Sequence, residues 1–145
     1  LAPTARVTLT SEGSSATNST TLLTDGKIDL ADNNSRWMSV GPLPHEIEFA
    51  WDKPVTIGAA RIVSGYNTKN GVVGALGDFA LQWRDGSAWR DVDGAKATAN
   101  TDPFWNRTFA PVTLERVRLR ITRSQGDTSR IWEVEFYGAV KAPSP

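Results

Sequence analysis

The chain contains no cysteine, and this absence excludes several kinds of site. Without thiolates there are no disulfides, no zinc–thiolate centres and no cysteine nucleophiles. The lack of cysteine does not indicate whether the protein resides in an oxidising or a reducing compartment, because a chain of 145 residues can bury a core without disulfides. No apolar run approaches the length of about eighteen residues that a spanning helix needs, so no membrane span is expected.

The chain also lacks an excess of charge of either sign. Sixteen Lys and Arg residues balance sixteen Asp and Glu residues, for a net charge of zero. A protein that binds nucleic acid or anionic lipid electrostatically normally carries a basic excess. We therefore expect no nucleic-acid partner. The composition, 39% apolar and 22% charged, is typical of one compact globular domain.

Apolar residues alternate with polar ones, which predicts β-strands rather than helices. The alternation occurs at Val7 and Leu9, Ile47–Trp51, Phe79–Trp83, Val117–Ile121 and Trp132–Phe136. Segments rich in Gly, Asn, Asp, Ser and Pro separate these runs and predict long loops over 11–21, 29–35, 66–78 and 95–103. No fixed repeat is present. We expect an all-β antiparallel sandwich, with at most a turn or two of helix near 16–23.

Two of these runs carry further local signals. Residues 78–92 predict a hairpin, because Asp85-Gly86 supplies the positive φ of a tight turn. In the run that follows, alternate positions are basic, and these are Arg116, Arg118 and Arg120. This pattern predicts a strand with one face in the core and one solvated face on which the arginines pair with acidic neighbours. An anion-binding stripe is the alternative.

The inventory of catalytic side chains is small. His45 is the single histidine, and no serine lies in a Gly-x-Ser-x-Gly turn. Two carboxylate pairs, Glu46 with Glu48 and Glu133 with Glu135, each share a strand face, as glycoside hydrolysis would need. Neither pair has an evident orienting partner. We therefore expect a protein without catalytic activity.

The loop from Asp25 to Ser35 is rich in oxygen donors. It is not an EF-hand, because the third and twelfth positions counted from Asp25 are Lys27 and Arg36, where that loop needs an oxygen ligand and a glutamate. Two interpretations remain at this point. The loop is either a different calcium site, built partly from backbone carbonyls, or an ordinary Asx-rich turn.

Seven short segments occur in a fixed order within residues 4–139. They are Leu23–Gly26, Ser35–Trp37, Ile47–Phe49 ahead of Pro54-Val55, Ala60–Ile62, Asp85–Trp89, Arg116–Ile121 and Ile131–Gly138. This order resembles the F5/8 type C (discoidin) domain and is most similar to family 32 carbohydrate-binding modules. The resemblance implies a galactose-binding-like, eight-stranded antiparallel jelly-roll β-sandwich with sugar-binding loops at one end. We expect one module over residues 1–139, followed by a Pro-rich linker remnant over 140–145.

The resemblance also implies a structural calcium ion. Mapped onto this sequence, the side-chain ligands are the carboxylates of Asp25 and Glu133 and the hydroxyl of Ser35. The remaining ligands implied are the backbone carbonyls of Leu22, Lys27 and Trp132. Because the loop is long, Asp29, Ala31 or Asp32 are alternatives to Lys27.

A sugar site needs an apolar platform and a few fixed polar groups. We predict Trp105 as the platform, because it is the one tryptophan that follows a loop without strand alternation. Its predicted neighbours, and the polar loop residues that complete the candidate set, are Arg107, Tyr66, Asn67, Asn70, Arg36 and His45. The resemblance implies a galactose- or fucose-type sugar or polysaccharide.

Together these features predict a non-catalytic carbohydrate-binding module of a secreted, bacterial, polysaccharide-active enzyme. Its partners would be the carbohydrate and the catalytic domain of the parent chain, and we expect a monomer located outside the cell. The alternative is a discoidin-type adhesion domain that binds a protein or lipid surface through apolar loop tips, for which Val72-Val73 is the candidate.

Overall fold

Antiparallel β-strands make up the computed structural model, which describes residues 1–9 and 19–138. The strands are β1 (Arg6–Leu9), β2 (Trp37–Met38), β3 (His45–Ser64), β4 (Tyr66–Thr68), β5 (Gly71–Val73), β6 (Asp78–Asp85), β7 (Ala88–Ala97), β8 (Phe104–Arg123) and β9 (Arg130–Tyr137). Three short 3-10 helices accompany them: η1 (Ala2–Thr4), η2 (Thr20–Leu23) and η3 (Gln125–Asp127). The predicted linker over 140–145 and most of the predicted loop over 11–21 lie outside the described residues.

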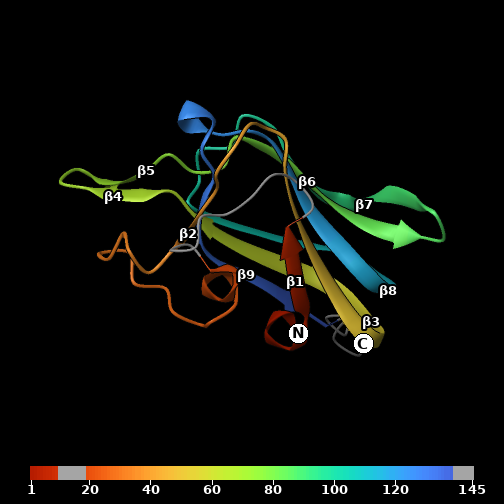
Figure 1. Ribbon diagram of the computed structural model, residues 1–145. Helices are drawn as coiled ribbons and strands as arrows, with labels where there is room; N and C mark the ends of the chain where they lie inside the picture. Colours follow the sequence, from red (N-terminus) through yellow and green to blue (C-terminus); the bar gives the residue numbers. More distant parts are fainter. Residues whose placement is uncertain (10–18, 139–145) are drawn as a thin grey trace, which may run out of the picture.

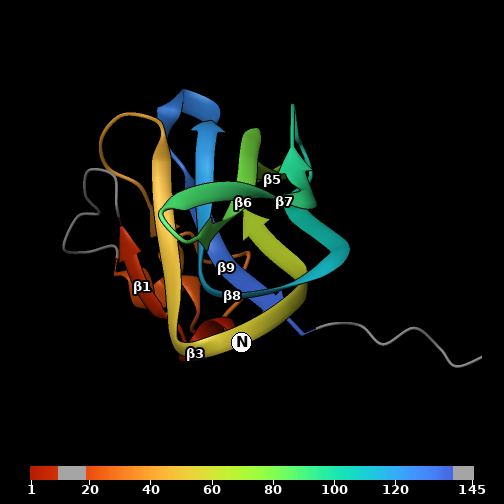
Figure 2. The same ribbon diagram turned by 90° about the vertical axis from the view of Figure 1, so that its right-hand side faces the viewer.

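The main sheet has the strand order β2-β9-β3-β8-β6-β7, and β1 pairs with β3. β3 and β8 are each 20 residues long. Their register breaks between Ala50 and Val55 of β3, so the first half of β3 pairs with β1 and the second half with β9. Both long strands therefore bend and contribute to two facing layers (Figures 1 and 2).

The predicted all-β antiparallel sandwich is confirmed. The strand count differs from the predicted eight, since nine strands occur among the described residues. Seven of them form the main sheet, and β4 and β5 form a separate two-stranded sheet within the segment predicted as a loop over 66–78. No helix in residues 1–9 and 19–138 has the length and apolar character needed to cross a membrane.

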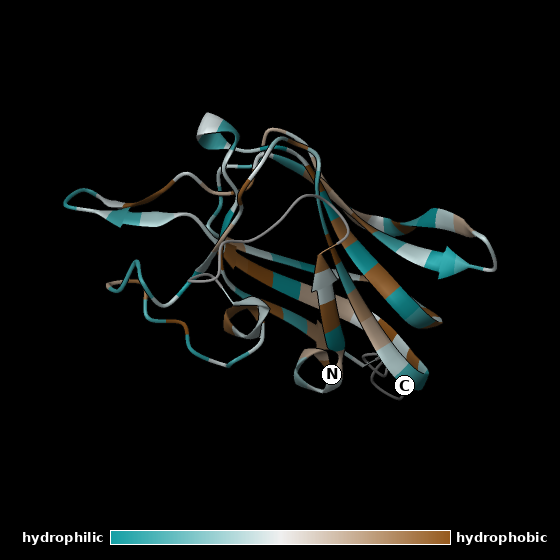
Figure 3. Cartoon of the chain, in the orientation of Figure 1, coloured by the Kyte–Doolittle hydropathy of each residue, from teal (hydrophilic) through white to brown (hydrophobic). Residues whose placement is uncertain are grey.

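The core lies between the layers and is formed by the alternating apolar residues, which appear as brown bands along the strands in Figure 3. Aromatic rings pack edge to face in it, with 5.0 Å between the ring centres of Phe49 and Phe136 and 5.1 Å between those of Phe79 and Trp105. Complete burial of one large apolar side chain contributes roughly 1.5–3 kcal/mol. The strands that carry this core therefore hold the loops in fixed positions.

The predicted hairpin is present as β6–β7, in which Asp85 pairs with Ala88 and Gly86 has a φ of 62°. On the outer face of β8, the arginines pair with acidic residues of β3 as predicted. The ion pairs are Arg116–Glu48 at 3.4 Å, Arg118–Glu46 at 3.0 Å and Arg120–Glu46 at 3.3 Å.

The bend of β3 brings both of its ends to one end of the sandwich, which we call the loop end. Backbone hydrogen bonds join the loops there. They run from Ser64 N to Pro103 O (3.0 Å), from Gly65 N to Arg130 O (2.9 Å), from Ser39 N to Ser129 O (2.9 Å) and from Asn100 N to Gly77 O (2.9 Å). The β4–β5 hairpin and η3 project from this region, and the N-terminus lies on the far side of the sandwich (Figure 1).

Candidate functional site

A cluster of polar and aromatic side chains gathers at the loop end. We call it the loop-end cluster, and its members are Asn33, Arg36, Tyr66, Asn67, Gln125 and Arg130. Asn33 and Asn67 form a reciprocal pair, in which Asn33 Nδ2 donates to Asn67 O (3.2 Å) and Asn67 N donates to Asn33 Oδ1 (2.8 Å). Arg36 Nη1 donates to Gly65 O at 3.2 Å. These bonds attach the loop before β2 to the β4–β5 hairpin.

Tyr66 is fixed from several directions. Gln125 Nε2 donates to its hydroxyl at 3.1 Å, and the Arg130 guanidinium lies 5.0 Å from the ring centre. Gly74 packs so closely that an added Cβ would lie 2.6 Å from Cε1 of Tyr66, and its φ is +71°. A side chain at position 74 would therefore displace the ring.

A cavity of about 350 Å³ adjoins Tyr66. Its lining residues are Val72, Val73, Gly74, Ala75, Asn100, Thr101 and Gln125. Gly74 and Gln125 belong both to this lining and to the surroundings of Tyr66. Val73 is 39% exposed, so the cavity combines an accessible apolar wall with amide and hydroxyl groups.

Arg36 is the most constrained cation of the loop-end cluster. Its guanidinium carbon lies 5.7 Å from the ring centre of Trp132, and its buried Nε has no hydrogen-bond partner among the described residues. Burial lowers the pKa of Arg36 below its usual value, and the positive charge of Arg130 lowers it further. A buried donor without a partner costs free energy, so an oxygen acceptor that reached it from outside the chain would stabilise it.

The prediction that Trp105 lies in an exposed loop is wrong. Trp105 is the second residue of β8, pairs with Ile62 of β3 and is only 1% exposed. Its ring packs against Phe79, so it presents no free face to a sugar. The preceding residue, Phe104, points outward and is 40% exposed. The sequence did not reveal this strand start, because residues 106–108 are all polar.

The other predicted sugar contacts divide into two groups. The loop-end cluster brings together Arg36, Tyr66 and Asn67. His45 is buried, and its two ring nitrogens contact Ser129 Oγ (2.7 Å) and Gly41 O (3.1 Å), so neither nitrogen is available to a ligand. Asn70 is exposed in the turn between β4 and β5, whereas Arg107 lies on β8 over the Trp105 ring. Gln125 and Arg130 were not predicted.

Two of the predicted metal ligands approach each other beside β9. Glu133 is 2% exposed, and its Oε2 has no hydrogen-bond partner among the described residues. Burial raises the pKa of Glu133 to about 7, with further increases from the negative charges of Asp25 and Glu135. A hydrogen bond from the Gly26 backbone and the charge of Arg61 oppose this rise. A buried oxygen anion next to a second carboxylate fits the donor set of a hard divalent cation.

The remaining predicted ligands are arranged around the preceding loop. Asp25 Oδ1 accepts from Lys27 N at 2.9 Å. Ser35 Oγ donates to Asp32 O at 2.8 Å, and Trp132 Nε1 donates to the same carbonyl at 3.1 Å. The Leu22 carbonyl belongs to the half-buried residue before the end of η2. No group of three or more His, Cys, Asp or Glu side chains suited to a metal occurs in the described part of the chain, so a cation here would need backbone carbonyls.

Three of the four carboxylates that were considered for catalysis form ion pairs with neighbouring arginines. Glu46 and Glu48 form the ion pairs with β8 described above. Glu135 binds Arg61 with an N···O distance of 2.5 Å. Glu133 alone among the four is buried without a cationic partner in contact, at the site described above.

The solved structures provide the informative comparison, because no family model and no curated protein matches the chain. A family 32 carbohydrate-binding module from Streptococcus pneumoniae EndoD superposes with a TM-score of 0.75 at 18% identity, covering 94% of this chain and 97% of that one. CpGH89CBM32-5 from Clostridium perfringens, solved in complex with GalNAc-β-1,3-galactose, gives 0.72 at 18% identity over 94% and 99%. The chain has the fold of family 32 carbohydrate-binding modules.

This module fold also occurs within a longer chain. The structure of SpGH29 matches with a TM-score of 0.74 at 20% identity, covering 96% of this chain. The chain spans only 28% of the length of SpGH29. The carbohydrate-binding-module fold implied by the seven sequence segments is therefore confirmed. Sequence identities of 18–20% support a shared fold and nothing beyond it.

Proposed function

We propose that the chain is a non-catalytic sugar-binding module that takes a galactose- or fucose-type sugar at the loop-end cluster. The observation that carries the proposal is that hydrogen bonds of Arg36 and Asn33 hold the loop before β2 against the start of β4, where Tyr66 adjoins a cavity of about 350 Å³. That volume lies within the range of about 300–1,000 Å³ typical of small-molecule sites.

The chemistry of the cavity suits a pyranose. Val73 offers an apolar wall for the C–H face of the ring, and Thr101 and Gln125 offer polar groups for its hydroxyls. Arg36 donates to the Gly65 carbonyl next to Tyr66 and so fixes the start of β4 that positions the Tyr66 ring. Shared fold with a module solved in complex with GalNAc-β-1,3-galactose supports this class of ligand.

We further propose that the module belongs to a secreted, bacterial, polysaccharide-active enzyme and acts as a monomer. Its contribution would be to raise the effective concentration of a linked catalytic domain at the substrate. The occurrence of this fold as 28% of the longer SpGH29 chain supports such an arrangement.

A calcium ion completes the proposal. The buried, unpartnered Oε2 of Glu133 and the neighbouring Asp25 are the side chains that would hold it, with backbone carbonyls as additional ligands. The ion would neutralise two carboxylates and stabilise the folded loop. Its role is therefore structural, and it is separate from sugar recognition.

Glycan-array screening followed by calorimetry with the best ligand tests the sugar proposal. Tyr66→Ala should weaken binding by a factor of about 5 to 150, since a ring that positions the site contributes about 1–3 kcal/mol. Tyr137→Ala is the matched control, because Tyr137 is the only other tyrosine, is 46% exposed and lies at the opposite end of β9. Equal weakening by both variants, or no glycan bound by the wild type, contradicts the proposal.

Adhesion to a lipid surface is the second candidate, favoured by the exposed side chains Val40 (45%) and Val73 (39%). Two isolated valines bury little area in a bilayer interface. Sedimentation with phosphatidylserine vesicles in the same experiment distinguishes the two functions. Vesicle binding that Val73→Ser abolishes, without any glycan bound, would favour adhesion.

A further inference from the structure

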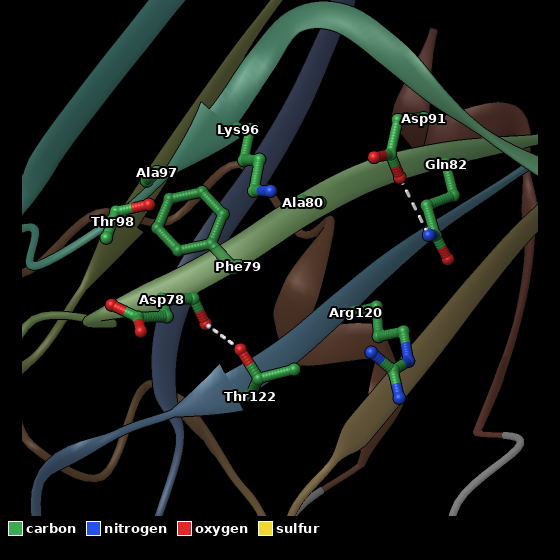
Figure 4. A pocket seen from close by; sticks show the side chains of 10 residues that line it. All are labelled: Asp78, Phe79, Ala80, Gln82, Asp91, Lys96, Ala97, Thr98, Arg120 and Thr122. Carbon is green, nitrogen blue, oxygen red and sulfur yellow. Dashed lines mark hydrogen bonds between the residues drawn. The ribbon is translucent and has the colours of Figure 1, made fainter.

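A second cavity of about 350 Å³ opens on the outer face of β6, β7 and β8 (Figure 4). It shares no residue with the loop-end cluster. The lining residues are Asp78, Phe79, Ala80, Gln82, Asp91, Lys96, Ala97, Thr98, Arg120 and Thr122. We call this cavity the sheet groove.

The sheet groove arises from a long irregularity in β7. Ala80 of β6 pairs with Lys96, whereas Gln82, only two residues further along β6, pairs with Asp91. β7 therefore carries extra residues between these pairs, and Gly94 among them has a φ of +83°. Extra residues bend a strand away from its partner. The small side chain of Ala80 leaves the space beneath open.

Two cations flank the floor of the sheet groove. Ala80 pairs with Lys96 on one side and with Arg120 on the other, and Figure 4 shows the two basic side chains on either side of β6. No carboxylate lies within ion-pair distance of Lys96 among the described residues. Arg120 Nε lies 3.3 Å from Glu46, but that carboxylate also binds Arg118 at 3.0 Å. The single negative charge of Glu46 is thus shared between two guanidinium groups.

The two acidic residues of the lining are already engaged. Asp78 Oδ1 lies 3.2 Å from Arg123 Nη2 and accepts from Ala99 N at 2.7 Å. Asp91 Oδ1 accepts from Gln82 Nε2 at 2.8 Å. The two basic side chains therefore lie at the middle of the groove, whereas Asp78 and Asp91, which keeps its negative charge, supply oxygen atoms that accept hydrogen bonds from hydroxyls at its two ends.

We propose that the sheet groove is a second binding site, specific for a carboxylate-bearing oligosaccharide. A uronate carboxylate would lie between the Lys96 ammonium and the Arg120 guanidinium, and the ring hydroxyls would contact Thr98, Thr122 and the free oxygen of Asp91. This site lies beyond the proposed function, because it is independent of the loop-end cluster and recognises a charge that a neutral galactose-type sugar lacks.

Calorimetry with α-1,4-linked trigalacturonate and its neutral methyl ester tests the charge requirement. The acid should bind at least tenfold more tightly than the ester, and its affinity should fall as salt is raised, because the cations are solvent-exposed. Equal affinity for acid and ester overturns the proposal.

Matched variants test the location. Lys96→Gln should weaken trigalacturonate binding at least fivefold, whereas Lys53→Gln, at another exposed lysine, should change it less than twofold. Ala80→Leu should block the groove, and Ala88→Leu, at the exposed first residue of β7, is its control. Thermal melts of all four variants exclude unfolding as the cause. Unchanged binding by Lys96→Gln and Ala80→Leu overturns the proposal.

The two sites can be separated by backbone amide NMR. Trigalacturonate should shift the amide signals of Ala80, Lys96 and Arg120, and Tyr66→Ala should leave its affinity within twofold. If the shifts appear instead at Asn67, Gly74 and Gln125, the sheet-groove proposal fails while the loop-end site stands. Loss of neutral-sugar binding in Tyr66→Ala with intact trigalacturonate binding supports both sites.

Discussion

Replacing Glu133 with glutamine should have opposite effects in the absence and presence of calcium. Glu133 is a buried carboxylate whose Oε2 has no partner among the described residues, and its pKa is raised from 4.5 to about 7. A shift of this size corresponds to about 3 kcal/mol, which burial of the charge removes from the free energy of unfolding. A calcium ion at the site would offset this cost.

The sign follows from the direction of the shift. A carboxyl group with a raised pKa in the folded state contributes stability below pH 4.5, and this contribution is lost as the pH rises towards 7 and above. At pH 8 the calcium-free protein therefore bears the full cost. Glu133→Gln removes the charge but leaves a buried amide. We therefore expect the free energy of unfolding to increase by about 1–2 kcal/mol at pH 8 in the presence of a chelator.

Thermal melts at pH 8, with EDTA or with calcium, provide the assay. The wild type should melt several degrees higher in calcium, since about 1 kcal/mol shifts the melting temperature of a domain this size by roughly 3–5 °C. Glu133→Gln should melt above the wild type in EDTA and should not respond to calcium. Glu135→Gln, on the same strand but paired with Arg61, is the control and should retain the response. A wild-type melting temperature that does not change with calcium, with Glu133→Gln destabilised in both buffers, would show that Glu133 holds no calcium ion.

Three further predictions test the core and the loop end. Trp105→Ala should lower the free energy of unfolding by about 3–5 kcal/mol in urea titrations, whereas Phe104→Ala should lower it by less than about 1.5 kcal/mol, and similar losses would contradict the assigned burial. Tyr66→Ala should weaken sugar binding by about 1–3 kcal/mol in calorimetry with little change in the thermal melt. Gly74→Ala should weaken binding and lower the melting temperature, because its Cβ would meet the Tyr66 ring at a positive φ, and a neutral result would argue against that packing.

Regular alternation made most of the fold predictable. The runs 47–51, 79–83 and 117–121 place apolar residues in the core at every second position, so their pattern reflects burial directly. The start of β8 was not predictable in this way, since Trp105 is followed by polar residues and is buried by pairing with β3, a contact between segments distant in sequence. The β4–β5 hairpin was missed because its strands are only three residues long and contain Asn67 and Gly71, whose residue types are depleted in strands.

The candidate sites depend on tertiary contacts to different degrees. Resemblance to a family brought Asp25 and Glu133 together, which spacing alone would not have done. Gln125 and Arg130 join Tyr66 only through the turn around η3, and no local pattern marks them. The sheet groove depends on the irregular pairing of β7 with β6, and the sequence of either strand alone does not specify this pairing.

Chemical-shift mapping with a galactose-type sugar on the isotopically labelled protein shows directly whether the loop-end cluster binds it. Titration with methyl β-galactoside and methyl α-fucoside should shift the amide signals of Asn67, Gly74 and Gln125, while those of Ala2 and Tyr137, on the far side of the sandwich, should stay unchanged. We expect saturable shifts that are confined to the loop end. Shifts confined to the far side, or none with either sugar at millimolar concentration, would contradict this expectation.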